Sequence, residues 1–152
     1  MRLYEDENGQ RFAFEDDGSQ DNLITENLTL VSQATLDSDA LASAIEAKKQ
    51  EVNTKRDAKN AVPILHQVDG VDKYFTIDIL DWNTHALSMD DAETIDWICT
   101  DNSTVSINKS DILSLCNHIR VRRTNSFLTG RIQKDEIMAL TTVADVEAYV
   151  VQ

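Results

Sequence analysis

The only proline of the chain, Pro63, separates two parts with different patterns. Proline lacks a backbone amide and disfavours a helical conformation in the residue before it, so a helix that precedes Pro63 must end there. In the segment before Pro63, four residues are spaced so that they would share one face of a helix with 3.6 residues per turn: Leu41, Ile45, Lys48 and Val52. We therefore predict a helix over residues 37–60, capped by Asp37 or Ser38, with a hinge at 58–63.

The N-terminal segment predicts short strands. Apolar residues at 3–4 and 11–14 flank Asn8-Gly9, a pair that favours the positive φ of a tight hairpin turn. Residues 23–24 and 28–31 predict a further short strand. Because an isolated hairpin is marginally stable in water, this block must pack against something else.

Strand patterns resume after Pro63. We predict strands over 64–68, 73–79, 94–100 and 103–107, with a short helix over 82–89 between them. Residues 74–79 alternate between polar and apolar, as expected of a half-buried strand.

Two helices are predicted at the C-terminal end. Asn108 and Asp111 form the pattern of a capping box that opens a long helix, and Gly130 is expected to weaken or break it. Thr142 with Asp145 predicts the cap of a last helix. The fold class is therefore α+β: an N-terminal β-hairpin block and helix, then a small antiparallel sheet packed against C-terminal helices. We expect an acidic β block over 1–34, a connecting helix over 35–62 and an α+β domain over 63–152.

The charge distribution restricts the partners of this chain. Its 152 residues carry a net charge of −13, and ten acidic and two basic residues give positions 1–40 a charge of −8. This charge disfavours binding to nucleic acid and to anionic membranes. We expect no membrane attachment, since no stretch approaches the ~20 apolar residues of a span. Residues 1–6 lack an apolar signal-peptide core, which predicts synthesis in the cytosol without export.

Motifs for catalysis and cofactor binding are missing from the sequence. The four glycines are isolated, so no phosphate-binding loop is predicted, and the three histidines lack the spacing of metal ligands. Cys99 and Cys116 are interpreted as reduced core residues. We therefore expect no catalytic residues, metal or cofactor, and a protein that is not an enzyme.

Two features of the sequence favour binding to a partner. The first is a basic stripe within an acidic chain, made of Arg120, Arg122, Arg123, Arg131 and Lys134. It is either a solvated helix face, contacting the acidic N-terminal block, or a docking surface for an acidic partner segment. Nucleic acid is a weaker interpretation, because Phe127 alone interleaves with these bases. The second feature is the aromatic set Tyr74, Phe75, Trp82 and Trp97, for most of which core packing is the default. Trp82 is the member that we single out as an interface anchor available to a partner.

A resemblance to a known family rests on four motifs between Ala47 and the C-terminus. They are the basic helix Lys48-Lys49…Lys55-Arg56 that precedes the strand Tyr74 to Asp78, the pattern Trp97-x-x-x-Asp101-Asn102-x-x-Val105-x-Ile107, the helix Asp111-Ile112-Leu113-x-Leu115 with trailing arginines, and the ending Ile137 to Glu147. This part resembles an uncharacterised phage domain family encoded beside or within tail-fibre genes. The acidic stretch Tyr4 to Asp21 resembles the opening of tail-fibre assembly proteins.

The resemblance implies a function in bacteriophage virion assembly. It implies a tail-fibre assembly chaperone, or a fibre-bound accessory protein, that acts by protein–protein binding on the phage tail-fibre protein. Such a protein works in the host cytoplasm during assembly and is in some cases retained in the virion tail. The alternatives are a virion structural component of the tail or baseplate, and an acidic phage inhibitor of a host defence enzyme. A homo-oligomer is compatible with each of them.

Overall fold

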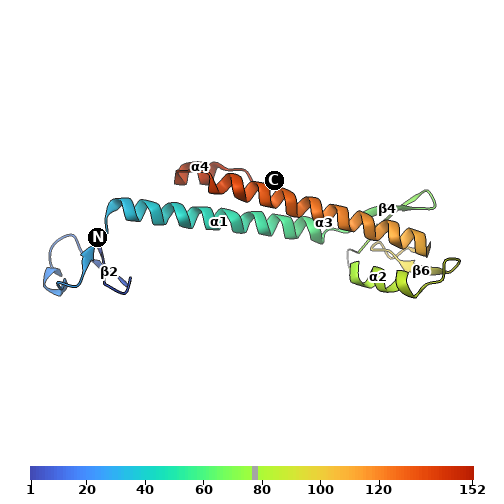
Figure 1. The fold of residues 1–152 in the computed structure, drawn as a ribbon, viewed down its shortest axis with the longest axis horizontal. Coiled ribbons are helices and arrows are strands. Elements are labelled where there is room, and N and C mark those ends of the chain that lie inside the picture. Colours follow the sequence, from blue (N-terminus) through green and yellow to red (C-terminus); the bar gives the residue numbers. More distant parts are fainter. Residues whose placement is uncertain (77–78) are drawn as a thin grey trace.

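The computed structural model describes residues 1–76 and 79–152, which form an elongated molecule (Figure 1). A small β block lies at one end, a pair of long helices that we call the stalk forms the middle, and a mixed α/β head lies at the other end. This arrangement confirms the predicted α+β class. Among the described residues, no helix has the length and apolar character needed to cross a membrane.

The N-terminal block is a three-stranded antiparallel sheet in the order β2-β1-β3. Its strands are β1 (Arg2–Glu5), β2 (Arg11–Phe14) and β3 (Thr29–Leu30). Gly9, with φ +79°, confirms the predicted hairpin turn. The strand expected at residues 23–24 is wrong, because a 3-10 turn, η1 (Asp21–Leu23), occupies part of that segment. Within the fully described segment 1–31, Phe14 is the one buried residue, so the block has almost no core of its own.

Helix α1 (Gln33–Ala61) is longer than predicted at both ends. It is capped by Ser32, whose Oγ accepts a hydrogen bond from the Thr35 amide at 3.1 Å, and not by the expected Asp37 or Ser38. The helix ends directly before Val62 and Pro63, as the proline requires. The hinge predicted at 58–63 is therefore helical as far as residue 61.

Helix α3 (Lys109–Met138) runs antiparallel to α1 along the stalk. The predicted capping box is confirmed: Asn108 Oδ1 accepts from the Asp111 amide, and Asp111 Oδ2 accepts from the Asn108 amide, each at 3.0 Å. The predicted break at Gly130 is wrong, since the helix continues for two further turns. A short helix, α4 (Val143–Ala148), is capped by Thr142 as predicted. The stalk has a small buried core of Val52, Ile137, Val146 and Val151.

The head contains the main hydrophobic core. Its strands form two separate antiparallel pairs, β4 (Ile64–Val68) with β5 (Val71–Phe75), and β6 (Thr94–Ile98) with β7 (Thr104–Asn108). They enclose α2 (Ile79–Ser88) and the first half of α3. The strand predicted over 73–79 ends at Phe75 in β5, and Ile77 and Asp78 lie outside the described residues. Cys99 and Cys116 are buried free thiols in this core, as predicted.

Candidate functional site

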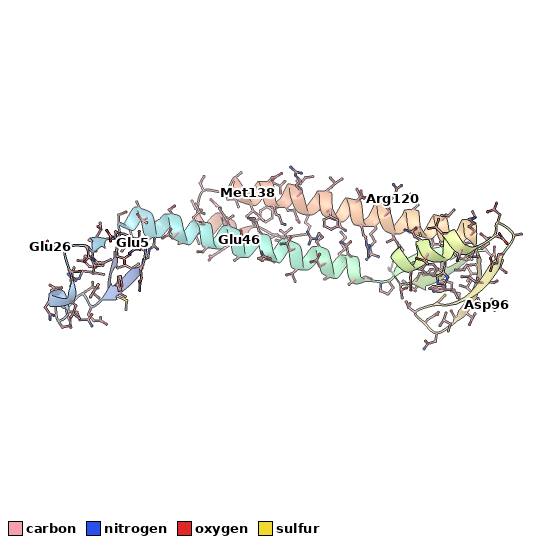
Figure 2. The ribbon with its side chains drawn as sticks, turned by 60° about the horizontal axis from the view of Figure 1, so that its bottom comes forward. Glu5, Glu26, Glu46, Asp96, Arg120 and Met138 are labelled. Carbon is pink, nitrogen blue, oxygen red and sulfur yellow. The ribbon has the colours of Figure 1, made fainter. Side chains whose placement is uncertain are left out.

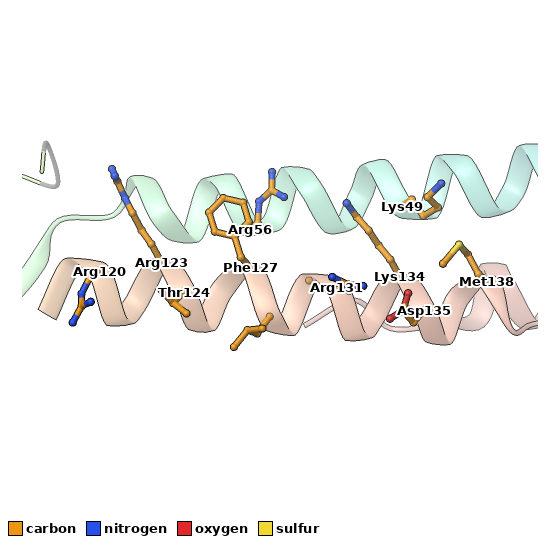
Figure 3. A pocket seen from close by; sticks show the side chains of 12 residues that line it. Lys49, Arg56, Arg120, Arg123, Thr124, Phe127, Arg131, Lys134, Asp135 and Met138 are labelled. Atoms are coloured by element: carbon orange, nitrogen blue, oxygen red, sulfur yellow. The ribbon is translucent and has the colours of Figure 1, made fainter. Parts of the chain in front are cut away.

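A groove of 710 Å³ runs along the α1–α3 pair in the middle of the molecule (Figure 3). Two α1 residues and ten from α3 line it: Lys49, Arg56, Arg120, Arg123, Thr124, Phe127, Leu128, Gly130, Arg131, Lys134, Asp135 and Met138. The lining comes from residues that are far apart in sequence but adjacent across the helix pair. We call this site the α1–α3 groove.

The α1–α3 groove is strongly basic in a chain that is acidic overall. Six of its lining residues are basic and one, Asp135, is acidic, which gives the site a charge of +5, against −13 for the whole chain. Like charges raise the free energy of the unoccupied site, so an acidic occupant would be favoured there. The groove is therefore a local exception to the charge of the molecule.

Apolar side chains lie among these cations. Phe127, Leu128 and Met138 are 54%, 56% and 52% exposed. The Arg56 guanidinium lies over the Phe127 ring, 4.7 Å from its centroid, an interaction of about 0.5–1 kcal/mol at an exposed site. The surface thus combines the two features that an interface anchor uses, exposed aromatic area and arginine.

Three cations of the groove contact nearby polar side chains. Lys134 Nζ donates to Asn53 Oδ1 at 2.6 Å, Lys49 pairs with Glu46 at 2.7 Å, and Arg120 donates to Asn117 at 2.9 Å. Arg131 has no ion-pair or hydrogen-bond partner among the residues that the structure describes. An exposed pair such as Lys49–Glu46 contributes about 0–1 kcal/mol, so a partner can exchange with it at little cost.

The structure brings together most of the basic stripe that the sequence singles out. Arg120, Arg123, Arg131 and Lys134 all line the groove. Arg122 does not: it donates to the carbonyl oxygens of Lys59 and Val62, the latter at 2.9 Å, and so holds the end of α1. Sequence reasoning missed the α1 members, because Lys49 and Arg56 belong to the basic half of that helix and carry no separate signal.

Trp82 is not available to a partner, and that expectation is wrong. Its side chain is fully buried in the head, and its Nε1 donates to the Thr76 carbonyl oxygen at 3.1 Å. Its ring lies 3.9 Å from that of Trp97. The reason is the helical spacing of α2, which places Trp82 on the same buried face as Ala86.

The acidic N-terminal block does not cover the groove of its own chain. An ion pair between Arg11 and Asp39 at 2.5 Å holds the block beside the start of α1. Figure 2 shows Glu5 and Glu26 at that end, well separated from Arg120. Because Lys49 lies ten residues after Asp39 on a rigid helix, about 15 Å separates that ion pair from the first groove residue. The structure therefore does not show the alternative in which the basic stripe contacts the acidic N-terminal block of the same chain.

Burial and nearby groups shift the pKa values of three residues in the head and the stalk. Burial, and then the nearby charge of His118, lowers the pKa of His66, whose ring lies 5.8 Å from that of His118. Burial raises the pKa of the Cys116 thiol. Burial and a hydrogen bond to Glu136 raise the pKa of Tyr149 to about 12. Within residues 1–76 and 79–152, no three His, Cys, Asp or Glu side chains form a group that would hold a metal ion.

Comparison with known proteins assigns the chain to a family. No curated protein matches it, and no solved structure matches it. A family model does match residues 43–151, a segment that contains the groove and the head and excludes the N-terminal block. Since that match covers more than half of the chain, the protein belongs to the family described as a domain of unknown function, DUF4376.

Proposed function

We propose that this protein acts by binding another protein, as a bacteriophage tail-fibre assembly chaperone or fibre-bound accessory protein. The observation that carries the binding function is the α1–α3 groove, where exposed Phe127, Leu128 and Met138 lie among six cations. The assignment to tail fibres is supported by the sequence resemblance of residues 47–152 and of the acidic N-terminus.

The physical need for such an accessory supports the proposal. A trimeric fibre exposes strand edges and apolar surface before its chains associate, and these surfaces favour aggregation. A protein with an exposed apolar and charged groove can cover one such surface until the trimer closes. The proposed site of action is the host cytoplasm, with retention in the virion tail as a further element of the proposal.

The N-terminal block supports a second contact with the partner. Its outer strands, β2 and β3, each pair with β1 on one side, so their other edges are open within the described sheet. In the same block, Leu23 of η1 and Leu30 of β3 are 56% and 55% exposed. A block with so little core gains stability when a partner covers it.

Co-expression with the neighbouring fibre gene tests the proposal. We expect the yield of soluble, trimeric fibre to fall when this protein is left out, because uncovered fibre chains aggregate. The readout is trimer yield after size-exclusion chromatography. An unchanged yield of trimeric fibre would contradict the chaperone function.

A structural role in the tail or baseplate is the second candidate, and the elongated stalk favours it (Figure 1). A structural component is present in purified virions at a fixed copy number, which quantitative mass spectrometry measures. Retention at fixed copy number together with unchanged fibre solubility in its absence would select this candidate over the chaperone.

A further inference from the structure

Helix α3 has two faces that each repeat with the alternating spacing of four and three residues that packs helices together. The first face consists of Ile112, Cys116, Ile119, Arg123, Ser126, Gly130, Gln133 and Ile137. All of these except Arg123 are buried against α1 and the head. This spacing is the heptad pattern of helices that lie nearly parallel or antiparallel.

The second face is shifted by one residue and is exposed to solvent except at Lys134, which is half-buried. It consists of Arg120, Thr124, Phe127, Arg131, Lys134 and Met138, which again alternate in steps of four and three. All six residues line the α1–α3 groove. A helix with two such faces is typical of a bundle in which it contacts two neighbours, and α1 is only one of them.

Helix α1 presents a matching face to the same groove. Lys49 and Arg56, one heptad apart, line the groove, and Asn53 between them accepts a hydrogen bond of 2.6 Å from the groove residue Lys134. A groove between two adjacent helices, lined by residues at heptad spacing, can be occupied by a third helix.

The chemistry of the groove specifies its occupant. The charge of +5 favours carboxylates on the occupant, and the exposed Phe127, Leu128 and Met138 favour apolar side chains on it. From Arg120 to Met138 the open face spans about 27 Å, the length of a helix of about five turns. We propose that the groove binds an acidic amphipathic helix of about five turns from a partner protein. This inference rests on the proposed function, whose binding site it specifies.

Two other occupants fit the groove less well. Nucleic acid would meet the overall charge of −13 and the carboxylate of Asp135 within the groove. The α3 helix of a second copy would bring a second set of groove cations against the first, and like charges in close contact are destabilising. The binding experiment distinguishes both occupants from an acidic helix.

The direct test uses a fluorescein-labelled helical peptide of about 20 residues, with leucine and glutamate at alternating heptad positions. Fluorescence anisotropy with the full-length protein measures its affinity. We expect saturable binding that weakens about tenfold or more in Arg131→Glu and in Phe127→Ala. The matched control is Lys59→Glu, which makes the same charge reversal on an exposed turn of α1 outside the groove, and which we expect to leave the affinity within about twofold.

Four results would overturn the inference. One is equal binding of a scrambled peptide of the same composition, which would show that charge alone acts. Another is an equal loss in Lys59→Glu. A third is a DNA duplex that binds more tightly than the peptide and is lost in Arg131→Glu. The last is concentration-dependent self-association in sedimentation that Arg131→Glu abolishes. Circular dichroism of each variant confirms that its helices are intact.

Failure of this inference is distinguishable from failure of the proposed function. If fibre trimers require the protein but form equally with Arg131→Glu, and the peptide does not bind, the groove assignment is wrong and the chaperone function stands. If the peptide binds as expected but fibre yield is independent of the protein, the proposed function is wrong and the groove is still a helix-binding site.

Discussion

Gly130 of α3 faces Val52 of α1 at the centre of the stalk. A β-carbon placed on Gly130 would lie 3.5 Å from Val52 Cγ1 and 3.9 Å from Arg56 Cδ, which are ordinary van der Waals distances. Gly130 and Val52 are both buried. The contact between the two long helices therefore has room for one methyl group at this position.

We predict that Gly130→Ala stabilises the protein. Glycine in a helix interior is about 0.8–1.0 kcal/mol less favourable than alanine, and no steric clash offsets this difference. Urea denaturation should show an increase of about 0.5–1 kcal/mol in the free energy of unfolding. Gly70→Ala is the control: Gly70 has φ +78°, so alanine should destabilise that turn. A loss of stability in Gly130→Ala would contradict the packing described here.

Arg122 should matter for stability and not for binding. Its guanidinium donates to the Lys59 and Val62 carbonyls, which have no partner within α1 at the end of that helix. We predict that Arg122→Met lowers the free energy of unfolding by about 1–2 kcal/mol, measured by thermal and urea unfolding. Arg120→Met, which loses one exposed contact with Asn117, should change it by less than about 0.5 kcal/mol. An equal change in the free energy of unfolding in both variants would show that Arg122 does not stabilise the end of α1.

The head should lose stability in mild acid because of His66. Its pKa is lowered from 6.5 by burial and by His118, so the unfolded chain binds the proton more readily than the folded one. This contribution to stability is complete above pH 6.5 and is lost as the pH falls through the lower, folded pKa. NMR titration should place the His66 pKa below 6.5, and His118→Gln should raise it. In His66→Gln, an unchanged acid dependence below pH 6.5 would contradict this assignment.

Tyr149 should ionise late in an alkaline titration. Burial and the hydrogen bond to Glu136 raise its pKa from 10.0 to about 12, so the phenol stays protonated in the folded state. The stabilising contribution is complete below pH 10 and is lost as the pH rises toward 12. Absorbance at the tyrosinate band should show a late step that is absent in Tyr149→Phe and shifted to lower pH in Glu136→Gln. A single early step in the native protein would contradict the contact.

Much of the fold is predictable from local signals in the sequence. The Asn108–Asp111 capping box, the Thr142 cap, the Asn8-Gly9 turn and the end of the helix before Pro63 each depend on a few neighbouring residues. Local chemistry decides these features, so the sequence is sufficient to predict them.

The errors arise where tertiary packing decides. Gly130 weakens an isolated helix, but the buried face of α3 on both sides of Gly130 packs in the stalk and the head, and this packing outweighs propensity. Trp82 lies on the apolar face of a short helix whose burial depends on distant strands. The basic stripe of α3 is visible in the sequence, whereas its pairing with Lys49 and Arg56 depends on the antiparallel register of two helices separated by the whole head.

We propose that this protein binds a fibre partner through the α1–α3 groove, and site-specific photocrosslinking tests this binding most directly. A benzophenone side chain at Leu128, in the groove, is compared with one at Leu87, which is 87% exposed on the head. After co-expression with the fibre and irradiation, we predict a covalent adduct with the fibre subunit from position 128 and none from position 87. An adduct from position 87 alone, or from neither position, would contradict the claim.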